Sequence, residues 1–436
     1  MSAVSKDSDV CAEPAGHGVH VAFYIRSVAS GRGAERSIIN VCQGLAARGH
    51  HVDLVVDRDD GWLLDLLREN CPGVRIVPLR ASRLDVLSLS GSLLAAVREL
   101  TIHPGKEAGH PRKQAGVAAA VAYAVAHRLP VRPLRTYLKR SKPQFLFSFL
   151  NKANVTVLLS AALGTPNTRL AVTFHNTLSA AAGLGTSRRM LDILPVFLHH
   201  ADKVIAVSEG VREDLLKISG MGTTADRFAI LHNPVFDDEI LRLAEAPLDH
   251  PSFANPSVPV IVAAGKLKPQ KDYPTLLKAF ALVRERRAVR LLILGDGEEH
   301  DRLTRLCHDL GIADDVAFVG YVRNPYAFFR HANLFVMSSR HEGMPTALIE
   351  AIACGCPAVS TDCPSGPNEI LAGGRYGRLV PVGDSEALSD AIMRTLDAPI
   401  PSETLVERAR AFSFERAIDA YEDLVLGMSG SSRIPS

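Results

Sequence analysis

The sequence predicts an α/β protein made of two Rossmann-like domains that face a central cleft. The chain has 436 residues, which is more than one hydrophobic core usually organises. Short apolar runs that end in small residues alternate with segments of helical apolar spacing, as in parallel sheets with crossover helices. The alternation begins near residue 19 and begins again near residue 259, after a stretch rich in proline and polar residues. Two similar domains joined by a linker explain this pattern.

The first half opens with a β-α-β unit. An apolar run at residues 19–25 is followed by a segment of helical spacing and by a second run at residues 51–56. A right-handed crossover between two such strands begins a doubly wound sheet. Ser208 is placed to cap a helix that covers residues 211–217. Further strands of this half are expected at residues 144–149, 170–175 and 203–207.

The second half repeats the alternation, and the chain divides into four parts. Strands are expected at residues 259–264, 290–294, 316–319, 334–337 and 358–360, and helices at 273–287, 298–310, 345–354 and 385–396. The four parts are a disordered tail (1–18), a first domain (19–235), a second domain (236–412) and a last helix (413–428). That helix, which Ser413 begins, is expected to cross back to the first domain.

The charges are spread unevenly, although the formal net charge is only +2. No acidic residue lies between Glu107 and Asp192, whereas basic residues accumulate there. Few aromatic residues accompany them, which argues against nucleic acid as a partner. A helix over 131–142 with Leu134, Tyr137 and Leu138 suits an anionic membrane surface. The alternative is an ordinary solvated helix face. The basic residues are Arg112, Lys113, Arg128, Arg132, Arg135, Lys139, Arg140 and Lys142.

The sequence gives no signal for membrane insertion or secretion. No run approaches the ~20 apolar residues of a spanning helix, and residues 1–18 lack the basic start and apolar centre of a signal peptide. We therefore expect a cytoplasmic protein that attaches peripherally to the inner face of the cytoplasmic membrane. The seven cysteines are odd in number and scattered, which favours reduced thiols over a disulfide framework. Cys354, Cys356 and Cys363 cluster, but their spacing is not that of a structural zinc site.

Three candidate sites follow strands of the first half. The loop that contains Gly33 opens a helix and offers N–H groups to an anion or a sugar. It departs from the dinucleotide fingerprint at Arg36, and a tight turn alone is the alternative. Asp57 and Asp59 resemble a Mg²⁺-binding acid pair, but we favour a surface loop and expect no metal. His175 ends a strand where its imidazole would face the cleft.

Two loops of the second half carry the strongest chemical pattern. Lys266 and Lys271, in the loop that Gly265 begins, can clamp two phosphates and neutralise charge as a bond to phosphate breaks. Glu342 follows a strand and stands before a helix whose N-terminus can face an anion. Glu350 lies inside that helix among apolar residues, where a carboxylate requires hydroxyl donors such as those of a ribose.

The acid pair at Glu342 and Glu350, with a glycine, a proline and an alanine-rich helix, resembles glycosyltransferase family 4. The resemblance covers most of the chain, because the further motifs fall in the family's order. These are residues 33–35, 172–175, 207–209, 232–234, 265–271, 294–297 and 318–320. The family, also called glycosyl transferases group 1, consists of retaining enzymes of the GT-B fold. The resemblance thus implies an acceptor-side first domain and a nucleotide-sugar-binding second domain.

The resemblance also implies residue roles. Glu350 would bind the ribose, Glu342 and His175 the transferred sugar, and Lys271 the phosphates. Lys266 replaces the family's usual arginine, so that a point charge stands where a bidentate fork is common. The other residues implied in binding, through backbone groups or the base edge, are Gly33, Gly265, Gly320, Tyr321, Gly343, Met344, Pro345 and Thr346. No metal cofactor is implied, because the departing diphosphate can itself take the acceptor's proton.

The resemblance leaves the substrates open. The stretch 363–369 is similar to members that use UDP-sugars in surface-polysaccharide assembly, which favours a UDP-linked hexose or N-acetylhexosamine. The acceptor would be a glycan or a polyprenyl-linked glycan. Two alternatives remain, a nucleotide-sugar epimerase of the GT-B fold and a catalytically silent glycan- or lipid-binding protein. An epimerase would need further carboxylates in the cleft, and a silent relative need not keep Lys271, Glu342 and Glu350.

Overall fold

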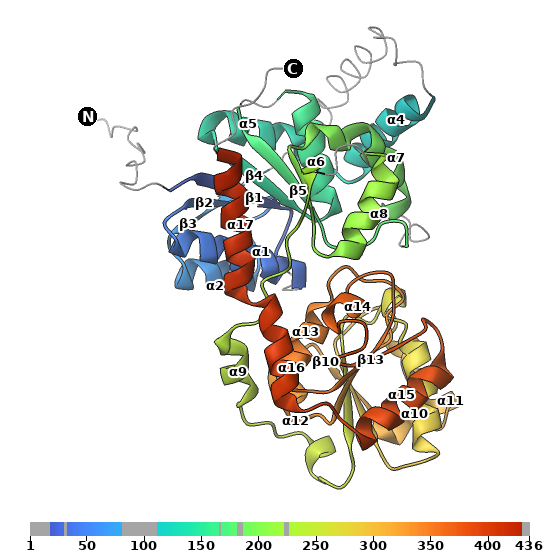
Figure 1. Cartoon of the computed structure of the whole chain (residues 1–436). Helices are drawn as coiled ribbons and strands as arrows, with labels where there is room; N and C mark the ends of the chain where they lie inside the picture. Colours follow the sequence, from blue (N-terminus) through green and yellow to red (C-terminus); the bar gives the residue numbers. More distant parts are fainter. Residues whose placement is uncertain are drawn as a thin grey trace, which may run out of the picture.

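The computed structural model of the chain describes residues 18–29, 33–80, 111–164, 167–180, 186–221 and 226–429. These residues fold as two α/β domains, each with one parallel sheet covered by helices (Figure 1). The predicted fold class is therefore confirmed. Residues 1–17 of the expected tail, and Gly31 and Arg32 of the glycine loop, lie outside the described residues.

The first domain contains a seven-stranded parallel sheet in the order β3-β2-β1-β4-β5-β6-β7. Its strands are β1 (His20–Ile25), β2 (His51–Val56), β3 (Val74–Pro78), β4 (Phe145–Phe149), β5 (Arg169–Phe174), β6 (Lys203–Ala206) and β7 (Phe228–Ile230). Its helices are α1 (Gly33–Ala47), α2 (Trp62–Asn70), α4 (Pro111–Ala126), α5 (Val131–Ser141), α6 (Asn151–Ala162), α7 (Thr186–Phe197) and α8 (Glu209–Ser219). Ser208 caps α8 as predicted, since its hydroxyl accepts from the Val211 N–H.

Alternate residues of the central strands face two separate apolar layers. In β1, Val21 and Phe23 join the layer that contains α1, whereas Ala22 and Tyr24 join the layer of α4 to α8. All four side chains are fully buried. A strand buried on both faces leaves only its ends to solvent, so functional side chains of this sheet must lie in the loops.

The second domain contains a six-stranded parallel sheet in the order β10-β9-β8-β11-β12-β13. Its strands are β8 (Val260–Ala264), β9 (Arg290–Leu294), β10 (Val316–Gly320), β11 (Leu334–Met337), β12 (Ala358–Thr361) and β13 (Arg378–Val380). Its helices are α9 (Asp238–Ala244), α10 (Tyr273–Arg284), α11 (His300–Asp309), α12 (Tyr326–His331), α13 (Thr346–Ala353), α14 (Pro367–Ile370), α15 (Ser385–Asp397) and α16 (Ser402–Ala409). The short 3₁₀ helix η4 (Pro269–Lys271) follows β8.

The chain passes between the domains twice, and the two crossings are hydrogen-bonded to each other. The Phe236 N–H donates to the Phe412 carbonyl at 3.0 Å, and the Phe414 N–H donates to the Phe236 carbonyl at 2.8 Å. After the second crossing, α17 (Phe414–Ser429) lies along α1 of the first domain (Figure 1). Tyr421 of α17 is fully buried there, with its ring 5.7 Å from that of Phe147. The last helix thus completes the core of the first domain.

One prediction for α5 is wrong. Leu134, Tyr137 and Leu138 do not form a membrane-facing stripe, because all three are buried against the first domain's core. The Tyr137 hydroxyl donates to the buried Asp53 carboxylate at 2.5 Å, and Arg135 donates to the Leu163 carbonyl at the end of α6. The apolar side of α5 is therefore already occupied by protein. Among the described residues, no helix combines the length and hydrophobicity that crossing a membrane requires.

Candidate active site

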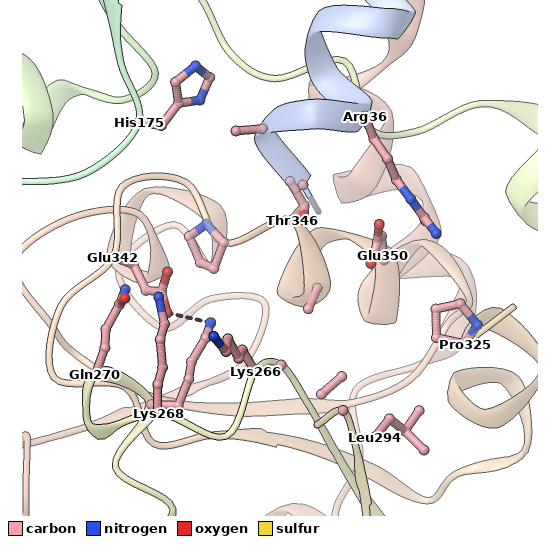
Figure 2. Close-up of a pocket in the computed structure, with 18 of the residues that line it drawn as sticks. Arg36, His175, Lys266, Lys268, Gln270, Leu294, Pro325, Glu342, Thr346 and Glu350 are labelled. Atoms are coloured by element: carbon pink, nitrogen blue, oxygen red, sulfur yellow. Dashed lines mark hydrogen bonds and ion pairs between the residues drawn. The ribbon is translucent and has the colours of Figure 1, made fainter. Parts of the chain in front are cut away.

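A cavity of about 630 Å³ lies between the two domains at the carboxyl ends of both sheets. It opens beside the positions where the strand order reverses, between β1 and β4 and between β8 and β11. Ligands of doubly wound sheets bind at such positions. Residues from both domains line it, among them Gly33, His175, Lys271 and Glu350. The candidate site therefore spans the domain interface (Figure 2).

Lys271 and Glu342 form an ion pair in this cavity. Lys271 ends η4, Glu342 lies in the loop after β11, and the Lys271 Nζ is 2.6 Å from the Glu342 Oε1. Their side chains are only 15% and 8% exposed. Burial by itself raises the pKa of Glu342, but the charge and hydrogen bond of Lys271 outweigh it and hold the pKa below its usual value. The pair is therefore charged at neutral pH.

The loop after β8 supplies the other cations. Lys266 lies 3.3 Å from the Glu298 carboxylate, and its side chain is one-third exposed. Lys268 also lines the cavity. The backbone turns at Gly265 with a φ of 149°, and the Tyr273 hydroxyl donates to the Gly265 carbonyl at 2.9 Å. The loop is thus fixed at its start, whereas the Lys266 ammonium can move toward a bound anion.

The N-terminal ends of α1 and α13 meet at the cavity. Met344, Pro345 and Thr346 line it at the start of α13, and Gly33 lines it at the start of α1. A Cβ at Gly33 would come within 2.9 Å of the Thr346 hydroxyl, so a side chain there would displace Thr346. Helix N-termini carry positive dipole, so two of them at one cavity favour an anion such as a diphosphate.

Glu350 faces Arg36 across the cavity. Glu350 has no hydrogen-bond partner among the described residues, and burial raises the pKa of its carboxyl, an effect that the Arg36 guanidinium opposes. Figure 2 shows Arg36 extending from α1 toward Glu350. Arg36 also lies 3.5 Å from the Tyr326 hydroxyl and from the Arg323 carbonyl. The departure from a dinucleotide fingerprint at position 36 thus places a cation of the first domain beside the acid of the second.

Gly343 lies at the contact between the domains and not on the cavity wall. It pairs with Asn176 in an isolated antiparallel bridge, and its carbonyl accepts from the Ser208 and Ser365 hydroxyls at 2.9 Å each. A Cβ on Gly343 would lie 2.0 Å from the His175 carbonyl oxygen. Only glycine therefore permits this approach of the two backbones.

The stretch 363–369 also joins the domains and does not line the cavity. Glu369 accepts from the Glu209 N–H at 3.0 Å and pairs with His232 at 2.8 Å. Ser365 is hydrogen-bonded to Ser208 at 2.6 Å. This stretch, which the sequence associates with UDP-sugars, therefore acts in the structure as support for the Glu342–Thr346 loop.

Two residues expected at the base edge differ in position. Tyr321 lines the cavity and is 49% exposed, so its side chain is accessible to a ligand. Gly320 does not line the cavity, and its carbonyl accepts from the Gly295 N–H at 2.7 Å. It continues the sheet edge and positions Tyr321.

The ring of His175 lies on the first-domain side of the site. Its centroid is 5.1 Å from that of Phe149, and in Figure 2 the ring is directed away from Glu342. Both ring nitrogens are buried and have no hydrogen-bond partner among the described residues. Burial lowers the pKa of His175 to about 4, so the imidazole is neutral at physiological pH.

Several residues of the cavity wall were not predicted from the sequence. Arg36, Trp62, Asn233, Gln270 and Asp296 line it and were not predicted. Asn233 stands in a motif already noted, so its position could have been inferred, whereas Trp62 carries no local signal. The acids Asp57 and Asp59 are bound instead to arginines, Arg26 and Arg68 respectively.

Comparisons with known proteins agree with this geometry. Residues 248–412 match the family model described as glycosyl transferases group 1, and residues 32–234 match a glycosyl transferase 4-like domain. The chain is 32% identical over 237 residues to the lipopolysaccharide core biosynthesis glycosyltransferase LpsE of Rhizobium meliloti. That match covers 52% of this chain and 65% of the relative, so the chain spans just under two thirds of that relative's length.

A Campylobacter jejuni relative and solved structures extend the comparison. The relative, N-acetylgalactosamine-N,N'-diacetylbacillosaminyl-diphospho-undecaprenol 4-alpha-N-acetylgalactosaminyltransferase, is 26% identical over 58% of this chain and 66% of its own length. Anabaena Alr3699/HepE in complex with UDP has a TM-score of 0.68 at 18% identity, covering 94% of this chain and all of that one. Sucrose-phosphate synthase from Thermosynechococcus elongatus has a TM-score of 0.71 at 20% identity, covering 94% and 99%. These likenesses confirm the GT-B fold.

Proposed function

The chain belongs to the family of glycosyl transferases group 1, and we propose that it is a retaining glycosyltransferase. It moves a hexose or N-acetylhexosamine from a UDP-sugar to a glycan or lipid-linked acceptor in surface-polysaccharide or glycoconjugate synthesis. One observation carries the proposal. A single interdomain cavity brings together the Lys271–Glu342 ion pair, the Glu350 carboxylate and the N-terminus of α13.

In this proposal each group has one task. Glu350 accepts hydrogen bonds from the ribose, and Glu342 accepts one from the transferred sugar. Lys266, Lys271 and the start of α13 hold the diphosphate and stabilise its charge as the bond to the sugar breaks. The leaving oxyanion takes the proton of the acceptor hydroxyl on the same face of the sugar, so that the configuration is retained. No metal is needed, since the cations already supply the positive charge.

The choice of UDP is supported by neighbours and by the exposed Tyr321 ring. The HepE structures are complexes with UDP, with UDP and glucose, and with UDP-glucose. The LpsE relative is named for lipopolysaccharide core biosynthesis, which supports an acceptor in a surface polysaccharide. Tyr321 offers its face to a base, while Arg36 lies beside the ribose position.

The proposal includes a cytoplasmic location with peripheral attachment to the inner face of the membrane. Arg132, Lys139 and Arg140 are exposed on α5, on the side opposite to its buried apolar residues. Attachment would then depend on charge alone and would be screened by salt, because each basic residue contributes on the order of 1 kcal/mol. Sedimentation with acidic vesicles at low and high salt tests it, with the three residues changed to Gln as the comparison.

A donor screen tests the activity. Nucleotide sugars are compared for thermal stabilisation of the protein and for slow hydrolysis, and the anomeric configuration of the released sugar is followed by NMR. We expect a UDP-sugar to give the largest stabilisation and the α-anomer of an α-linked donor to be released first. The Glu350→Gln variant should lose the stabilisation. Absence of any response to the nucleotide sugars would contradict the proposal.

A further inference from the structure

A second cavity, of about 360 Å³, adjoins the first and lies wholly within the first domain. It is lined by the segment after β1, by α4 and by the turn between β4 and α6. Leu150, His175 and Asn176 line both cavities. A molecule in the second cavity would therefore reach the transferred sugar in the first across His175.

The charged groups of the second cavity are mostly basic. Lys152 and Arg26 line it, and Lys152 has no acidic partner among the described residues. Arg26 pairs with Asp57 at 2.5 Å and donates to the His127 carbonyl at 3.1 Å. Asp57 is therefore already engaged by Arg26 and by the Tyr24 hydroxyl. The ammonium of Lys152 is thus left available.

A third cation, Arg189, acts on residues at the wall of the second cavity. Burial is the main reason why the pKa of His127 is lowered, and the charges of Lys152, Arg26 and Arg189 lower it further. Arg26 and Arg189 also act on Tyr123, whose side chain lines the cavity. The charges of Lys152, Arg26 and Arg189 thus act on the same wall with the same sign, and a positive potential of this kind favours an anion.

The acid-free part of the sequence accounts for this field. Tyr123, His127, Lys152 and Arg189 all lie between Glu107 and Asp192, where the chain has no acidic residue. The acid-free run, of which the sequence assigned only the part around residues 131–142 to a membrane surface, therefore also contributes to a cavity beside the site. Its basic residues on α5 and its basic residues at this cavity occupy different parts of the domain.

Neutral hydrogen-bond donors accompany the cations of the second cavity. The α6 helix begins at Asn151 without a side-chain cap, so its first N–H groups have no helical partner. The two ring nitrogens of His175 are buried and unpaired among the described residues, and its imidazole is neutral, so that one nitrogen carries a donor N–H. A cation, a helix start and an unpaired buried donor thus converge on one space.

We propose that the second cavity binds an oxyanion of the acceptor, a phosphate ester or a carboxylate, and so selects acidic acceptors. Lys152 makes the charged contact, and the start of α6 with His175 supplies neutral hydrogen bonds. The inference rests on the proposed glycosyltransferase function, because the anion is useful only beside a donor sugar. The donor's own diphosphate occupies the first cavity, where Lys266 and Lys271 lie.

The test uses the whole chain saturated with UDP, so that phosphate binding at the donor position is blocked. Binding of inorganic phosphate, glucuronate and glucose is measured by calorimetry or ligand NMR. We expect phosphate or glucuronate to bind saturably and more tightly than glucose. Lys152→Gln should weaken anion binding on the order of tenfold, as loss of a charge-assisted hydrogen bond does, and Lys152→Glu should abolish it. The tighter anion identifies the acceptor's acidic group.

The controls separate the two proposals. Lys217→Gln changes a lysine whose side chain is 79% exposed on α8 of the same domain, and it should bind anions like the natural chain. Failure of the natural chain to bind UDP would contradict the donor function. Retained UDP binding with no saturable anion binding, with equal anion binding by Lys152→Gln, or with equal affinity for glucose and glucuronate would overturn the acceptor inference alone.

Discussion

Replacing Lys271 by Met should destabilise the protein strongly as well as impair catalysis. The Glu342 carboxylate would remain buried, at 8% exposure, without the ammonium that now lies 2.6 Å away. Removing one partner of a buried pair typically costs about 3–5 kcal/mol, because the other charge loses its compensation. Solvent screening hardly reduces this cost, since Lys271 itself is only 15% exposed.

The loss of stability in Lys271→Met should be larger at neutral pH than at acidic pH. In the natural chain the pKa of Glu342 is lowered, so the pair stabilises the fold above the unfolded pKa and this stabilisation is lost as pH falls through the folded pKa. In Lys271→Met the two lowering effects of Lys271 are lost, so burial, the largest influence on Glu342, raises its pKa and the charged form opposes folding. The variant's deficit should therefore be largest near about pH 7.5 and smaller near about pH 5, where protonation relieves the carboxylate.

Thermal unfolding, followed by circular dichroism, measures the loss of stability. A loss of about 3 kcal/mol corresponds to a melting temperature lower by roughly 6–12 °C for a domain of 150–250 residues. The double variant Lys271→Met, Glu342→Gln should regain most of it, because no buried charge remains. Lys217→Met serves as the matched control, since its partner Glu213 is 4.0 Å away at the surface, and it should shift by little. A Lys271→Met melting point within about 2 °C of the natural chain, or no recovery in the double variant, would refute the reasoning.

Three further predictions follow from the site. Glu350→Gln should weaken UDP binding by about 1–3 kcal/mol in calorimetry, because the ribose hydroxyls lose a charged acceptor; unchanged affinity in a folded variant would remove the ribose assignment. Activity should persist in EDTA, because Lys266, Lys271 and the start of α13 supply the positive charge, and a strict Mg²⁺ requirement would contradict this. Gly343→Ala should lower turnover at least about tenfold, because its Cβ would lie 2.0 Å from the His175 carbonyl and hold the domains apart; normal turnover would show that this approach is dispensable.

The central strands could be predicted from the sequence, whereas of the four edge strands only β10 was predicted. Residues 290–294 and 334–337 form strands with the predicted bounds, because burial on both faces makes them almost wholly apolar. The strands β3, β7 and β13 lie toward the sheet edges, are short and contain half-exposed residues. They therefore lack the continuous apolar run on which the prediction depends.

The candidate site was predictable where a loop directly follows a buried strand. Lys271, Glu342 and Glu350 do line one cavity, because the carboxyl ends of parallel strands meet at one edge. Arg36 was not predictable, since its position beside Glu350 depends on how one domain faces the other. The prediction that the apolar side of α5 faces a membrane was wrong for a different reason. An amphipathic pattern shows that a helix has an apolar side, but does not show whether a membrane or the protein's own core covers it.

The position of α17 has a consequence for how the chain folds during synthesis. Tyr421, Ile418 and Val425 belong to the apolar layer that β1 and α1 share, yet they are separated from those elements by the entire second domain. Domains usually fold in the order in which they leave the ribosome. Here the first domain emerges first but cannot complete its core, because one side of α1 stays uncovered until the last helix has been translated. The second domain, although made later, is expected to reach its native core first.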